Sequence, residues 1–307
     1  MANKAYATLA LTLLMLVGCQ GPTATGMGTG GSAGGDSADS DGADYYDTVA
    51  TRAAFDQSNP GNFSENIAQT GHLSDAFKGV DGSWLNTDPG FEHNGVRTRN
   101  LSYVKDGGET YLAFKGYGWY YGGELAAGMK RGYPEGAAVI SANSLGPGRY
   151  EATLAAFPRE GGCTALWTYS TTGNEAVSQN EIDIEIGGAT DSSSFENAWF
   201  SSWVTHTSKL TDSVDVTDQL YLNDGRFHTY TFDWYTAYPG TGKGRIDFFI
   251  DGRLRSYIQG DLVTTQSMPL WLGVWFPAFA GTPAFATDYM YVKDIEYKAF
   301  SAFAQPY

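Results

Sequence analysis

The stretch Glu181-Ile182-Asp183-Ile184-Glu185 indicates the fold, because it alternates acidic and apolar residues as a β-strand does. Strand side chains point alternately to the two faces of a sheet, so the three acids share one face and the isoleucines share the other. A solvated strand face is the ordinary alternative. It is disfavoured because Asp and Glu are uncommon in strands and aligned like charges repel. The three carboxylates therefore indicate a site for acid/base chemistry, such as glycoside hydrolysis with two nearby carboxyl groups.

Other β-rich runs recur along the chain between Gly, Pro, Asn and Asp turn signals. We expect strands at residues 111–114, 137–142, 150–156, 164–169, 181–186, 199–205, 228–234, 245–250, 270–275 and 289–297. Asp251-Gly252, between two apolar runs, is a strong hairpin signal. No long helical period competes with these strands. The pattern predicts one all-β domain, a jelly-roll sandwich of two antiparallel sheets.

The first 19 residues are typical of an export signal, with the single cation Lys4 and the apolar run Leu9–Val17. The tetrad Leu16-Val17-Gly18-Cys19 resembles the bacterial lipobox, in which the cysteine receives the lipid. This resemblance predicts lipidation at Cys19 and a lipid-anchored protein of the cell envelope. Gln20, in place of the Asp that retains lipoproteins at the inner membrane, favours the outer membrane or cell surface. The alternative is that Cys19 merely ends an ordinary secretory signal.

Residues 20–44 are rich in Gly, Ser, Thr, Ala and Asp, and we expect a disordered tether there. The catalytic domain is expected to span residues 45–307. A formal net charge of −15 argues against nucleic-acid partners. Once Cys19 is lipidated, Cys163 is the only other cysteine, which excludes an intramolecular disulfide and favours a buried structural thiol. The four histidines show no ligand spacing, so no catalytic metal is implied.

Several segments together resemble glycoside hydrolase family 16, and they follow each other in the order of that family. They are Ser141–Glu151, Asn180–Glu185, Phe227–Trp234, Arg245–Leu254, Leu272–Trp275 and Tyr291–Tyr297. The acidic motif has no extra residue before its second Glu, which resembles the lichenase and xyloglucanase-like branch. The resemblance implies a concanavalin A-like jelly roll with a concave substrate groove. It also implies a retaining, endo-acting hydrolase.

The resemblance assigns a role to each acid of the motif. Glu181 matches the nucleophile, Glu185 the acid/base and Asp183 the assisting acid between them. We expect the three acids to titrate together, with Glu185 protonated to higher pH and Glu181 left ionised. Aromatic rings that stack on sugars are expected at four matching positions, each of which could instead belong to the core. These positions are Trp167, Tyr169, Trp203 and Trp275.

The sugar-reading positions depart from the mixed-linkage glucanases of the family. Those enzymes usually carry Glu and Arg where this chain has Ala138 and Ile140, and Asn where Gly273 stands. Glu124 and Glu135, in a Gly-rich stretch, could replace lost polar contacts, but we expect them in a solvated loop.

The predicted substrate is a β-linked polysaccharide, foremost a β-glucan with 1,3-1,4 or related linkages. A galactan hydrolase, a transglycosylase and a non-catalytic lectin are the alternatives, although a lectin has no need of three aligned carboxylates. We expect a monomer whose membrane contact is the lipid anchor alone. No cofactor is required, and a structural calcium ion of the outer sheet would fit the family without identifiable ligands.

Overall fold

A computed structural model describes residues 55–56, 77–82, 93–106, 108–187, 197–215, 222 and 226–300. The predicted signal segment 1–19, which includes Cys19, and the predicted tether 20–44 lie outside the described residues. Within the described part, strands dominate, and no helix there is long and apolar enough to cross a membrane.

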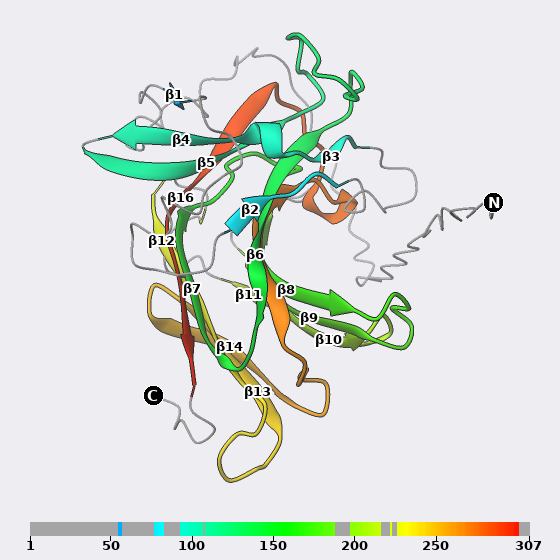
Figure 1. The fold of residues 1–307 in the computed structure, drawn as a ribbon, viewed down its shortest axis with the longest axis vertical. Coiled ribbons are helices and arrows are strands. Elements are labelled where there is room, and N and C mark those ends of the chain that lie inside the picture. Colours follow the sequence, from blue (N-terminus) through cyan, green and yellow to red (C-terminus); the bar gives the residue numbers. More distant parts are fainter. Residues whose placement is uncertain are drawn as a thin grey trace, which may run out of the picture.

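The strands form two layers, as Figure 1 shows. In spatial order the first layer holds β11 (Ser208–Asp215), β10 (Asn197–Thr205), β9 (Gln179–Gly187), β8 (Cys163–Thr171), β15 (Met268–Trp275), β6 (Glu135–Leu145) and β2 (Phe77–Gly79). The second layer holds β4 (Leu101–Asp106), β5 (Glu109–Tyr117), β16 (Thr287–Ala299), β7 (Gly148–Ala155), β12 (His228–Tyr235), β13 (Gly244–Ile250) and β14 (Arg253–Gly260). Two short strands, β1 (Phe55–Asp56) and β3 (Gly95–Val96), pair with β4 and β6. The predicted jelly-roll sandwich and all ten predicted strands are confirmed.

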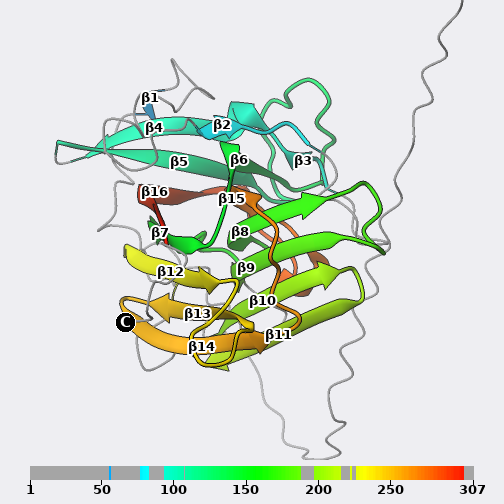
Figure 2. The same cartoon turned by 60° about the horizontal axis from the view of Figure 1, so that its bottom comes forward.

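The layers connect at one edge through a single pair, Tyr117 of β5 with Glu135 of β6. At the opposite edges β11 and β14 approach each other, and the Ser256 hydroxyl donates a hydrogen bond to Asp212. The sheet therefore curves almost into a closed barrel, which Figure 2 shows from another side.

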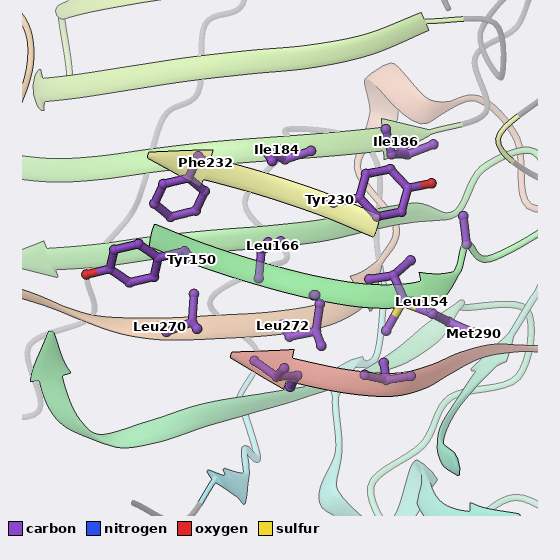
Figure 3. Close-up of a cluster of buried hydrophobic side chains, with 14 of the residues drawn as sticks. Tyr150, Leu154, Leu166, Ile184, Ile186, Tyr230, Phe232, Leu270, Leu272 and Met290 are labelled. Atoms are coloured by element: carbon purple, nitrogen blue, oxygen red, sulfur yellow. The ribbon is translucent and has the colours of Figure 1, made fainter. Parts of the chain in front are cut away.

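The core lies between the two layers and contains the inward-facing side chains of both (Figure 3). Ile184 of β9 and Leu166 of β8 face Tyr150 and Phe232, which stack with ring centroids 4.5 Å apart. Because Ile182 and Ile184 are at most 1% exposed, the face of β9 that carries the acids must point away from this core. Core packing thus fixes the direction of the three carboxylates.

The expectation of a solvated loop is wrong for Glu135, although Glu124 is exposed. Glu135 begins β6 and is fully buried. Arg99 Nη2 binds its carboxyl oxygens at 3.0 and 2.7 Å, and Asn100 Nδ2 donates to Oε1 at 2.9 Å. A buried carboxylate is tolerated here because it is paired and hydrogen-bonded.

The hairpin predicted at Asp251-Gly252 connects β13 and β14. Both residues have positive φ, 51° and 73°, as the two central residues of a type I′ turn require. The Asp251 carboxyl also accepts hydrogen bonds from the Thr229 backbone at 2.8 Å and pairs with His228 Nδ1 at 2.7 Å.

Candidate active site

Strand β9 brings Glu181, Asp183 and Glu185 together on the face turned away from the core. We call this the carboxylate face, made by the outward side chains of β8, β9, β10 and β15. The antiparallel ladders place Tyr169 and Trp203 opposite Glu181, Trp167 and Ser201 opposite Asp183, and Ala165 and Trp199 opposite Glu185. Aromatic residues therefore flank the acids on both sides, as a sugar site requires.

Two of the acids accept hydrogen bonds from neighbouring side chains. Trp203 Nε1 donates to Asp183 Oδ2 at 3.0 Å, and Gln179 Nε2 donates to Glu181 Oε2 at 2.7 Å. Lys209 of β11 places its ammonium 3.9 Å from the centroid of the Trp203 ring. These contacts orient Glu181 and Asp183 and bring one cation to the edge of the acidic row.

Glu185 has a different set of partners. The Cys163 thiol lies 3.7 Å from Glu185 Oε1. The Trp275 side chain also hydrogen-bonds the Glu185 carboxyl and opposes part of the rise that burial causes in its pKa. Trp275 stands opposite Cys163 in the ladder between β15 and β8. Glu185 is therefore held from β8 and β15, whereas Asp183 is held from β10.

Burial raises the pKa of all three acids. The pKa values of Glu181 and Glu185 rise from 4.5 to about 7, and that of Asp183 rises well above its usual range. The negative charges of neighbouring acids add to this effect, and Lys209 opposes it for both glutamates. The expected difference, with Glu181 ionised and Glu185 protonated, is not seen because burial affects both glutamates alike. The acids thus share protons near neutral pH, as a pair with one acid and one base requires.

The four predicted sugar-binding aromatic residues all lie on the carboxylate face, at different depths. Trp203 and Trp275 are partly exposed. Tyr169 is also partly exposed, and its hydroxyl donates to Glu175 Oε1 at 2.5 Å. Trp167 is buried and stacks on Trp271, with centroids 5.6 Å and planes 16° apart. Sugar stacking on each ring stays a prediction.

Sequence reasoning missed several side chains of this face. Trp199 stands opposite Glu185 on the neighbouring strand, and Trp271 points to the same face of β15 as Trp275. The alternation of side chains along each strand could therefore have placed both on this face. Phe279, 40% exposed, contacts the edges of Trp199 and Trp275 at centroid distances of 6.2 and 5.8 Å. It belongs to the 3-10 turn Ala278–Ala280, for which the sequence gives no signal.

The departure at Gly273 has a steric reason. A Cβ atom on Gly273 would lie 2.6 Å from the Ala137 carbonyl oxygen and 2.8 Å from the Ala138 Cβ. Ala138 packs with Trp167 and Trp271 in a small apolar cluster on this face. A larger side chain at Gly273 does not fit, so the floor beside the acids is apolar rather than hydrogen-bonding. Among the described residues, no group of three or more His, Cys, Asp or Glu side chains could hold a metal ion.

Comparison with known proteins agrees with this arrangement. A model of glycosyl hydrolases family 16 matches residues 99–287, which include all three acids. A beta-glucanase of Paenibacillus polymyxa is 26% identical over 161 residues, 50% of this chain and 61% of that protein. The chain thus spans about three fifths of the length of this curated relative.

Solved structures show the same fold. Beta-glucanase of Bacillus licheniformis is similar with a TM-score of 0.53 and 18% identity, over 73% of this chain and 92% of that chain. The laminarinase catalytic domain of Thermotoga maritima has a TM-score of 0.57 and 15% identity over the same shares. Since the family model covers more than half of the chain, the chain belongs to glycosyl hydrolases family 16.

Proposed function

We propose that this chain is a retaining, endo-acting glycoside hydrolase that cleaves a β-linked glucan. The observation that carries the proposal is the row Glu181, Asp183 and Glu185 on the face of β9 that is turned away from the core. Family membership and the similarity to a beta-glucanase support the substrate class.

In the proposed mechanism Glu181 attacks the anomeric carbon while Glu185 protonates the leaving oxygen. Glu185 then takes a proton from water, which displaces Glu181 and restores the β configuration. Asp183, hydrogen-bonded to Trp203, adjusts the proton affinity of both neighbours. The double displacement needs no cofactor, and a structural calcium ion stays a proposal whose ligands are unknown.

Two substitutions separate the roles of the glutamates. Glu181→Ala is expected to abolish hydrolysis but to synthesise glycosidic bonds from an α-fluoride donor, because Glu185 still acts as a base. Glu185→Ala is expected to keep turnover on substrates with a very good leaving group, and azide should restore the second step. NMR of the first-formed product should show the β configuration. Inversion, or full activity of Glu181→Ala, would refute the assignment.

A panel of β-glucans, xyloglucan and galactans identifies the substrate. Shortened products from 1,3-1,4-glucan are the expected result, and cleavage of galactan alone would contradict the proposed class. Longer oligosaccharides formed from short donors would indicate transglycosylation. Binding of a polysaccharide without any cleavage would indicate that the protein is a non-catalytic lectin.

We also propose that the chain is exported and anchored through a lipid on Cys19, as Leu16–Cys19 suggest. The native protein is then expected in the membrane fraction, and Cys19→Ser should release it or block its processing. Soluble wild-type protein without lipid, as measured by mass spectrometry, would contradict the anchor.

A further inference from the structure

The buried thiol of Cys163 lies directly beside the carboxyl group of Glu185. Cys163 begins β8 and shares the carboxylate face with Ala165, the residue opposite Glu185. Its side chain is fully buried, with Sγ 3.7 Å from Glu185 Oε1 and 3.8 Å from the Thr164 carbonyl oxygen. These distances allow a thiol hydrogen bond to either oxygen.

The thiol keeps its proton in this position. Burial raises its pKa well above the usual range, and the negative charge of Glu185 raises it further. An ionised carboxylate is a stronger acceptor than a neutral carbonyl oxygen. The thiol proton therefore points to Glu185 whenever Glu185 carries its charge.

Two neighbouring strands hold the thiol at this place. Trp275 stands opposite Cys163 on β15, and its side chain hydrogen-bonds the sulfur. The Cys163 side chain is 0% exposed, so solvent does not reach the thiol. The buried thiol thus lies between Trp275 and the predicted acid/base Glu185.

We propose that Cys163 is a positioning residue, whose thiol donates a hydrogen bond to Glu185 and holds this carboxylate in place for proton transfer. The inference rests on the proposed role of Glu185 as the acid/base. Cys163 is not a nucleophile in this scheme, because it stays protonated and enclosed.

Other groups also act on Glu185 and set the background for a test. Glu181 and Asp183 face it from the same strand, Lys209 acts from β11, and the Trp275 side chain hydrogen-bonds it from β15. Trp275 also hydrogen-bonds Cys163. Cys163→Ser keeps a hydrogen-bonding group for Trp275, so a change in titration seen in Cys163→Ala but not in Cys163→Ser reports the lost donor.

The test compares Cys163→Ala and Cys163→Ser with the wild type in the pH dependence of kcat/KM on a soluble β-glucan. A donor to the ionised form lowers the pKa of an acid. Cys163→Ala removes the donor, so the pKa given by the alkaline limb of the pH profile should rise by about half a pH unit. Cys163→Ser keeps a donor and should leave the limb at or below its wild-type position.

A second measurement does not depend on turnover. Carbon-13 NMR of the labelled Glu185 carboxyl group should place its pKa in Cys163→Ala above that in Cys163→Ser. Equal values in both variants and the wild type would overturn the proposal. So would equal shifts in both variants, because a purely structural disturbance does not depend on a donor. Failure of the proposed function would instead appear as full activity of Glu185→Ala.

Discussion

Replacing Glu185 with glutamine is expected to stabilise the folded chain at pH 8 but not at pH 4. Glutamine has almost the same shape and carries no charge. Burial, followed by the negative charge of Glu181, raises the pKa of Glu185 from 4.5 to about 7. An acid with a higher pKa in the folded state binds its proton more tightly there than in the unfolded chain. Its effect on stability is therefore favourable at low pH and is lost as the pH rises from 4.5 to about 7.

The size of this effect follows from the same two values. The difference between 4.5 and about 7 corresponds to at most about 3 kcal/mol of unfolding free energy above pH 7. Water reaches the half-buried carboxyl, and Glu181 and Asp183 share its proton, so we expect about 1 to 3 kcal/mol. For a folded region of this size that raises Tm by about 3 to 10 °C.

Thermal unfolding followed by circular dichroism at pH 4, 6 and 8 measures the effect. Glu124→Gln is the matched control, because it removes the same charge from an exposed side chain. The difference in Tm between Glu185→Gln and the wild type should be small at pH 4 and grow with pH, while the control stays flat. A constant difference, or a lower Tm at pH 8, would refute the reasoning from burial.

Three further substitutions test individual contacts. Arg99→Met leaves the buried carboxylate of Glu135 without its ion-pair partner and should cost about 2 to 4 kcal/mol in urea unfolding, less when combined with Glu135→Gln. Equal losses in the single and double variants would contradict this. Trp203→Phe removes the indole donor to Asp183 and should change the pH profile but not the product configuration seen by NMR; an unchanged profile would count against it. Phe279→Ala should weaken oligosaccharide binding by about 1 kcal/mol in calorimetry with the fold intact, and unchanged affinity would assign Phe279 to packing.

Strands with a clear alternation could be predicted from the sequence, and those without it could not. Alternation identified β9, and the Asp-Gly pair identified the β13–β14 hairpin, because both signals are local. Strand β11, Ser208–Asp215, is polar and carries no such pattern. It forms because β10 offers it an antiparallel partner over most of its length. Such a strand is determined by its neighbour rather than by its own residues.

The site likewise contains residues that a local sequence pattern predicts and residues that it does not. The alternation of β9 placed the three acids on one face, and the resemblance to the family pointed to Trp275. Glu175 was not predicted, because its contact with Tyr169 depends on how the loop after β8 folds back. Glu135 was misread because a Gly-rich stretch indicates a loop, whereas its burial depends on Arg99, 36 residues earlier. Contacts between distant segments leave no pattern in a single sequence.

The burial that destabilises the ionised acids is also what the proposed mechanism needs. At their ordinary pKa values both glutamates would be charged at neutral pH, and neither could protonate a leaving group. Raised to about 7, one of the pair can hold a proton while the other is ionised. The stability lost to this burial must be supplied by the apolar core beneath β9, where Ile182 and Ile184 are fixed. Variants that relieve the charge should therefore gain stability only by losing activity.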